Sequence, residues 1–174
     1  AALTAMVGSL TVGKKKYAEF DDLARETLEK ARDLEHRFLD VMQRDTEAFN
    51  AVSAMFAMPK GTDEEKAARS QAMQQALQGC TRTPFEMMEL SLEALRLTEG
   101  LVDRSNANAA SDLGCAALHL GCAIQGAWLN VLINLGSIRD VAFAAQYRTR
   151  GQILLDEALP LSRRIYGRVL EMVE

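Results

Sequence analysis

One carboxylate stands where a helical protein normally places an apolar residue. Asp45 falls within a stripe of apolar side chains at spacings of three and four residues, formed by Phe38, Val41, Phe49 and Val52. That spacing predicts one face of a long helix, directed toward a core or an interface. A buried charge is costly unless it is paired, protonated or used. Asp45 is therefore either part of a structural ion pair or helix-end hydrogen bond, or an acid or base in a site between helices.

A polar stripe marks a second segment, whose residues 113–138 contain no Asp, Glu, Lys or Arg. At 100° per residue, its polar and small side chains fall within an arc of about 80°. They are Asn108, Asp112, His119, Gly126 and Asn130, with Asn134 beside them. Buried amides need hydrogen-bond partners. Two interpretations stay open: a polar seam between packed helices, in which the glycines serve packing, or a surface that holds a ligand.

The remaining candidates for a binding or metal site are basic residues and thiols. The run from Lys14 to Lys16 either compensates the dipole of a preceding helix end or binds an anionic group, and Lys60 lies in a Pro-Lys-Gly-Thr turn. Cys115, His119 and Cys122 share a helix face, but only neighbours three or four residues apart reach one metal, so packing is the better interpretation. There is no phosphate loop and no HExxH or Glu-x-x-His motif. No metal site is expected.

The elements that carry these residues are predicted to be helices throughout. The chain has 174 residues with 3 Pro and 11 Gly, and no segment alternates with period two. We expect a single domain over residues 1–174, folded as an all-α helical bundle. Helices are predicted at 1–12, 20–58, 62–79, 83–102, 105–136 and 139–173, with Thr83, Pro84 and Glu86 opening the fourth and the last kinked or split near Gly151 and Pro160.

The apolar fifth helix is long enough to span a bilayer, but its amides, histidine and glycines favour a buried central helix. Such a helix needs protein on every side, which predicts a homodimer. The net charge of −4 disfavours a nucleic-acid partner. Three cysteines without a CxxC pair favour reduced thiols and a cytoplasmic location.

Five blocks, in order along nearly the whole chain, resemble the signatures of one family. The family is formiminotetrahydrofolate cyclodeaminase, with its relative methenyltetrahydrofolate cyclohydrolase. Singly each match is weak, and together they are specific. The blocks run from Leu10 to Tyr17 (LTVGKKKY), Asp45 to Phe49 (DTEAF), Met58 to Lys66 (MPKGTDEEK), Ser105 to Leu113 (SNANAASDL) and Gly126 to Leu135 (GAWLNVLINL).

The resemblance implies an all-helical, homodimeric, cytoplasmic domain that binds a reduced folate, with or without a polyglutamate tail. It implies no membrane partner, no metal and no cofactor, because the tetrahydrofolate derivative is the substrate. The family usually carries a glycine-rich segment before its first helix. This sequence begins after that segment, so part of a site lined by it is expected to be missing.

The implied reaction converts 5-formiminotetrahydrofolate to 5,10-methenyltetrahydrofolate and ammonia. N10 attacks the formimino carbon, so one group must take its proton and another must protonate the departing amine. For this reaction we expect Asp45 and Asp112 to form the acid/base pair, without deciding which is which. The groups expected to hold the pterin are Asn106, Ser111, Asn130 and Asn134, and those expected to meet the glutamate tail are Lys14, Lys15 and Lys60.

Two other functions remain open at this point. The hydrolytic relative, 5,10-methenyltetrahydrofolate cyclohydrolase, shares the shape of the substrate and the need for carboxylates. A non-catalytic helical dimerisation module would bind no folate and would tolerate replacement of both aspartates.

Overall fold

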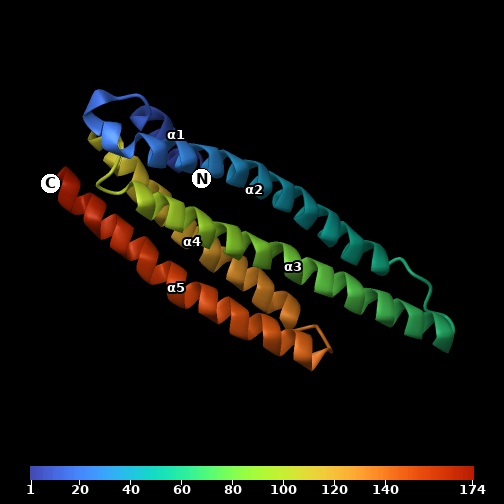
Figure 1. Cartoon of the computed structure of the whole chain (residues 1–174). Coiled ribbons are helices and arrows are strands. Elements are labelled where there is room, and N and C mark those ends of the chain that lie inside the picture. The colour runs from blue at the N-terminus through green and yellow to red at the C-terminus, as the bar shows by residue number, and fades with distance from the viewer.

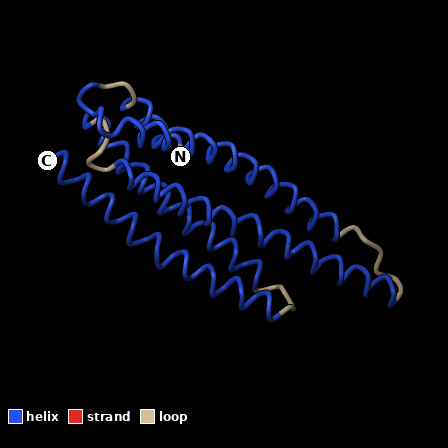
Figure 2. Tube along the Cα trace, viewed as in Figure 1, coloured by secondary structure: helices blue, strands red, loops and turns tan.

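The computed structural model describes all residues 1–174 and contains helices but no strand (Figures 1 and 2). The all-α prediction is confirmed. The elements in chain order are α1 (Ala2–Thr11), the 3₁₀ helix η1 (Lys15–Phe20), α2 (Asp21–Met55), α3 (Asp63–Leu101), the 3₁₀ helix η2 (Ala107–Ala109), α4 (Ala110–Leu135) and α5 (Val141–Val173).

Local chemistry accounts for three of the helix ends. Gly13 has a φ of 73°, which a glycine adopts without strain and which ends the first helix as expected. Thr62 and Glu65 form a reciprocal capping box at the start of α3. At the start of α5, the side chain of Asp140 accepts the backbone N–H of Phe143 at 2.9 Å.

The predicted break between residues 79 and 83 is wrong, because α3 runs unbroken through Pro84. Thr83 and Glu86 therefore do not cap a new helix. A proline inside a helix removes the donor for the carbonyl four residues earlier, here that of Cys80. Asn134 of α4 supplies the missing donor, with Nδ2 at 2.8 Å from the Cys80 oxygen. The predicted division of the last helix is also wrong, since α5 is continuous through Gly151 and Pro160.

Four long helices lie roughly side by side, and the short α1 packs at one end of them (Figure 1). Helix α3 contacts α2, α4 and α5, and α4 lies against α3 and α5. Their inner faces form one apolar cluster that includes Leu34, Met88, Leu95, Leu113 and Ile165. Helix α1 contacts both α2 and α4, so it covers the groove between them over part of its length.

Within one chain α4 is enclosed on only part of its surface. Length and composition would allow this helix to cross a membrane, but its buried face, with Leu113, Ile124 and Val131, belongs to the core. On the opposite side Leu118, Leu129 and Ile133 are 50%, 67% and 74% exposed. The expected burial on every side is therefore not achieved by one chain alone.

Candidate functional site

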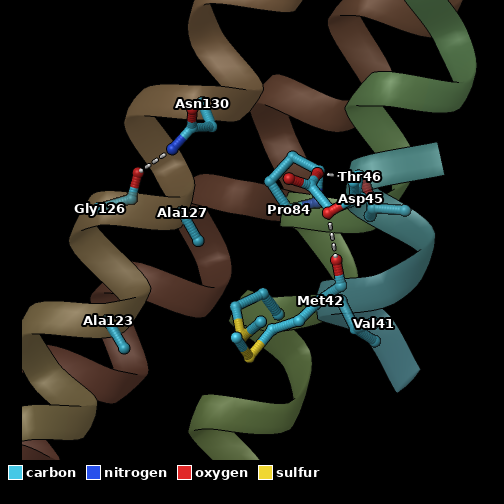
Figure 3. Close-up of a pocket in the computed structure, with 11 residues that line it drawn as sticks. Val41, Met42, Asp45, Thr46, Pro84, Ala123, Gly126, Ala127 and Asn130 are labelled. Carbon is cyan, nitrogen blue, oxygen red and sulfur yellow. Dashed lines mark hydrogen bonds between the residues drawn. The ribbon is translucent and has the colours of Figure 1, made fainter. Parts of the chain in front are cut away.

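A cavity of about 470 Å³ lies where α2, α3 and α4 meet beyond the reach of α1 (Figure 3). Pockets of a few hundred cubic ångströms suit ligands of drug or cofactor size. Its walls combine apolar side chains with a few polar groups. The lining residues are Val41, Met42, Asp45 and Thr46 of α2, Thr83, Pro84 and Met87 of α3, and Ala123, Gly126, Ala127 and Asn130 of α4.

Asp45 is the only carboxylate in this lining. Its side chain is exposed at the cavity wall rather than buried in the core, and Oδ1 accepts the hydroxyl of Thr83 at 2.7 Å. This hydrogen bond fixes the orientation of a charged group that remains open to a ligand. The exposure of Asp45 also explains how the apolar stripe tolerates a charge at this position.

Thr83 differs from the other buried hydroxyl residues of α3. Thr81, Ser91 and Thr98 each donate to the carbonyl four residues earlier in their own helix, at 2.7 to 2.9 Å. Thr83 instead reaches across to α2. Sequence reasoning took Thr83 for a helix cap and so missed this role.

Two contacts hold the helices in place around the cavity. The Arg44 guanidinium donates to both oxygens of Glu86, at 2.9 and 2.8 Å, which fixes α2 against α3 one residue before Asp45. The hydrogen bonds to Glu86 and Asp40 hold the pKa of Arg44 above its ordinary value, so this link stays charged. The second contact joins Asn134 to the carbonyl of Cys80 and fixes α4 against α3.

Cys80 is buried beside this junction. Desolvation raises the pKa of its thiol, and the negative charge of Asp45 raises it further. The thiol therefore stays neutral and serves packing rather than nucleophilic chemistry.

Asn130 faces Asp45 from the α4 side of the cavity (Figure 3). Its Nδ2 donates to the Gly126 carbonyl at 3.1 Å, while its side-chain oxygen accepts no hydrogen bond within the chain. A Cβ added to Gly126 would meet no atom within 4 Å. This wall therefore offers an amide oxygen and open backbone to a ligand.

A second group of predicted residues lies at the α1 end of the bundle. Lys14, Lys15, Lys16 and Asn106 line a shallow cavity of about 380 Å³ together with Tyr17 and Asn108. Both polar atoms of the Asn106 side chain form hydrogen bonds within the chain: Nδ2 donates to the Leu10 carbonyl at 3.1 Å, and Oδ1 accepts the Asn108 N–H at 3.1 Å. The N–H of Ala107 donates to the Tyr17 hydroxyl, which lowers the pKa of Tyr17.

Asp112 and Ser111 belong to the first turn of α4 near this end. Asp112 is half-buried and forms no hydrogen bond or ion pair within the chain, and Ser111 is exposed. Fourteen residues separate Asp112 from Gly126 in the cavity wall, a distance of about 21 Å along a helix. One chain alone therefore does not bring Asp112 and Asp45 together as an acid/base pair.

Lys60 lies in the loop before α3, beyond the cavity. It lines a hollow of about 290 Å³ together with three further cations, Lys66, Arg69 and Arg139. Arg69 donates to the Met55 carbonyl and Arg139 to the Ser70 hydroxyl, so neither guanidinium is paired with a carboxylate. Gln74, which also lines this hollow, lies about 14 Å along α3 from Thr83 of the cavity. The sequence singled out Lys60 but not its three basic neighbours, which are distant from it in sequence or look like ordinary surface charges.

Comparisons with known proteins agree with this architecture. The family model described as formiminotransferase-cyclodeaminase matches residues 1–152. Among curated proteins, the chain is 39% identical to methenyltetrahydrofolate cyclohydrolase of Methylorubrum extorquens, over 99% of this chain and 83% of the relative. It is 33% identical to formimidoyltransferase-cyclodeaminase of Sus scrofa, over 97% of this chain but only 31% of that protein.

One solved structure has the same fold over almost the whole of this chain. Formiminotetrahydrofolate cyclodeaminase from Thermotoga maritima superposes with a TM-score of 0.77 at 27% sequence identity, covering 98% of this chain and 79% of that one. The relatives thus carry two related activity names, and both names concern a one-carbon derivative of tetrahydrofolate.

Proposed function

The chain belongs to the formiminotransferase-cyclodeaminase family, and we propose that it acts on a one-carbon unit that is attached to N5, or that joins N5 and N10, of a reduced folate. The observation that carries this proposal is the Asp45 carboxylate, oriented by Thr83 at the wall of a cavity of about 470 Å³. A positioned carboxylate with one free oxygen suits proton transfer from N10 or a water molecule, or to a leaving nitrogen.

The first candidate reaction is cyclodeamination of 5-formiminotetrahydrofolate. N10 attacks the formimino carbon and forms the N10–C bond, and the bond from that carbon to the formimino nitrogen breaks as ammonia leaves. The proton lost by N10 passes to a carboxylate, and the leaving nitrogen receives a proton. Asp45 is placed for either transfer. Binding in the cavity would add rate by holding N10 close to the carbon.

The second candidate is hydrolysis of 5,10-methenyltetrahydrofolate. It is favoured by the 39% identity between this chain and a cyclohydrolase, in an alignment that covers 83% of that relative. Water adds to the methenyl carbon, one carbon–nitrogen bond breaks, and a formyltetrahydrofolate results. A single base that takes one proton from the water is sufficient, and Asp45 supplies it. The two reactions share the methenyl compound, as the product of one and the substrate of the other.

The positions of the polar and basic residues favour one orientation of this substrate. Asn130 offers an amide oxygen to the donors of a pterin ring, which leaves Asp45 free for proton transfer at the one-carbon unit. The cations around Lys60 lie farther along the groove, where an anionic glutamate tail would be attracted to them. Asn106 and Ser111, expected to hold the pterin, and Lys14 and Lys15, expected to meet the glutamate tail, lie at the α1 end of the bundle, away from the cavity that contains Asp45. Their proposed roles at the same site therefore require a second chain.

We further propose that the protein works in the cytoplasm as a homodimer, and that neither reaction uses a metal or redox cofactor. Support for the dimer comes from the exposed apolar side chains Leu118, Leu129 and Ile133 on α4. A non-catalytic dimerisation module, in contrast, would not need a carboxylate held in place by a cross-helix hydrogen bond.

The deciding experiment is a turnover assay of the purified protein with each substrate in turn, following methenyl absorbance and ammonia. Methenyl formation with an equal amount of ammonia identifies the cyclodeaminase. Loss of methenyl absorbance without ammonia identifies the cyclohydrolase. A folded protein that turns over neither substrate contradicts the proposed function and supports the dimerisation module.

A further inference from the structure

We propose that Asn134 of α4 is a positioning residue for Asp45 of α2, with which it shares no hydrogen bond. Asn134 occupies the Cys80 carbonyl, and this leaves the nearby hydroxyl of Thr83 to the carboxylate. The inference rests on the proposed function, in which Asp45 transfers the proton. It gives a residue outside the cavity control over the carboxylate at the cavity wall.

The Cys80 carbonyl is an acceptor that α3 cannot satisfy by itself. The residue four positions later is Pro84, which has no N–H to donate. A buried carbonyl without a donor is costly, and Cys80 is only 9% exposed. Asn134 Nδ2 lies 2.8 Å from this oxygen, so the donor comes from another helix.

Without Asn134, the same carbonyl would be open to a hydroxyl of α3. A threonine in a helix commonly donates to the carbonyl three or four residues earlier in its own helix. For Thr83, the carbonyl three residues earlier is that of Cys80, the one that Pro84 leaves free. The three other buried hydroxyls of α3 all donate back to their own helix, so such bonds are the rule along this helix.

The Thr83 hydroxyl has one proton to donate, so it cannot serve two acceptors at once. Its observed bond runs to Asp45 Oδ1 at 2.7 Å, while Asn134 occupies the Cys80 carbonyl. Cys80 and Asp45 are neighbours, since burial raises the pKa of the Cys80 thiol and the charge of Asp45 raises it further. Asn134 therefore removes a competitor for the proton that orients Asp45.

Asn134 itself is not part of the cavity lining. It lies one helical turn beyond Asn130, which is part of that lining. Because its amide meets the backbone of α3, we expect no contact between Asn134 and the pterin. Loss of the amide should therefore lower kcat and leave KM almost unchanged, as expected for Thr83→Val.

The test is a cycle of kcat measurements in two backgrounds. Asn134→Leu keeps the approximate size of the side chain and removes the donor, so kcat should fall about tenfold. Pro84→Ala returns a backbone N–H to the Cys80 carbonyl. In that background, whatever its own kcat, Asn134→Leu should lower kcat by less than about twofold. Equal losses in the two backgrounds overturn the inference.

A third background tests whether Asn134 acts through the hydroxyl. In Thr83→Val the proton is already absent, so adding Asn134→Leu should cause almost no further loss of kcat. Losses that multiply to about a hundredfold in the double variant would show that the two residues act independently, and would overturn the inference.

Ser162→Ala is the matched control for a general loosening of α4. It also removes a bond from a side chain to a backbone carbonyl between two helices, that from Ser162 to Ala117 at 2.7 Å. Urea unfolding should show a loss of stability in this variant, while its kcat stays at the wild-type value. A loss of kcat equal to that of Asn134→Leu would contradict a specific role for Asn134.

A crystal structure of Asn134→Leu provides a readout that does not depend on activity. Thr83 Oγ should lie within hydrogen-bond distance of the Cys80 oxygen and no longer of Asp45. Asn134→Ala, which also removes the donor, replaces this variant if leucine prevents folding. A Thr83 hydroxyl still bonded to Asp45 overturns the inference. If the bond switches but the wild-type protein turns over neither substrate, the proposed function fails and the positioning of Asp45 by Asn134 stands.

Discussion

The two faces of α4 differ sharply in how closely they meet the rest of the chain. Toward α5 the contact is tight. A Cβ at Gly121 would lie 2.7 Å from the Ser162 Oγ, and a Cβ at Gly151 would overlap the ring of Trp128. Ser162 also donates to the Ala117 carbonyl at 2.7 Å. Toward α2 the same helix leaves Gly126 and Asn130 beside an open cavity.

The difference between the two faces shows that glycines serve two purposes on α4. Against α5, the absence of a side chain allows helices to approach and is a matter of stability. Against α2, the absence of a side chain leaves room for a ligand or a partner. The closed face should therefore respond to substitution by unfolding, and the open face by losing activity while the fold persists.

The largest effect on stability is expected at the closed face. Gly151→Ala should lower the free energy of unfolding by about 3 kcal/mol, because the new methyl group overlaps the rigid ring of Trp128. Gly126→Ala is the matched control. It should leave stability unchanged or raise it by up to about 1 kcal/mol through helix propensity. Urea unfolding followed by circular dichroism measures both, and equal losses in the two variants would contradict the comparison.

Substitution of the two candidate catalytic carboxylates should instead reduce activity and leave stability unchanged. Asp45→Asn and Asp112→Asn are each expected to reduce turnover at least about a hundredfold, the scale for loss of a general acid or base. Their unfolding transitions should stay close to that of the wild type. Asp156→Asn, which alters an exposed carboxylate of α5 that accepts only from Gln152, is the control. Near-normal turnover of a folded Asp45→Asn variant would remove Asp45 from the mechanism.

A smaller effect is expected at the residue that positions Asp45. Thr83→Val removes the hydroxyl but keeps the shape of the side chain, and should lower kcat about tenfold with little change in KM. Thr83→Ser should retain most of the activity. Thr81→Val, whose hydroxyl bonds only to its own helix, should not change kcat. An equal loss of kcat in the two valine variants would indicate a general loss of packing instead.

The smallest effect is expected at the end of the groove. Lys60→Ala should raise KM about threefold for a polyglutamylated folate and change kcat little, the scale of one exposed charge. Because salt screens such interactions, the effect should fade as ionic strength rises. Lys30→Ala, which alters a lysine paired with Glu26 on the outer surface of α2, is the control. A KM for Lys60→Ala that is independent of salt would argue against a role for the charge.

Much of the fold could be predicted because its signals are local. The capping box of Thr62, the turn at Gly13 and the apolar periodicity of the long helices each depend on a few neighbouring residues. The break predicted at Pro84 failed because the donor that serves Cys80 is Asn134, 54 residues away in sequence. No local pattern reports such a contact.

The site could be predicted in part, for the same reason. Asp45 was identifiable because a charge interrupts an apolar stripe, whereas the hydroxyl that orients it belongs to another helix. Asn106 and Asn134 were identifiable as polar residues in unusual places, but the structure engages their side chains with backbone groups. The separation of Asp112 from Asp45 follows from the length of α4, and only an assembly of two chains would bring them together.

A crystal structure of the protein with a bound, unreactive reduced folate would test the central claim most directly. The account predicts the pterin within the cavity between α2, α3 and α4, with a ring nitrogen or the one-carbon unit within hydrogen-bond distance of Asp45. A folate bound elsewhere, with the Asp45 cavity containing only water, would contradict it.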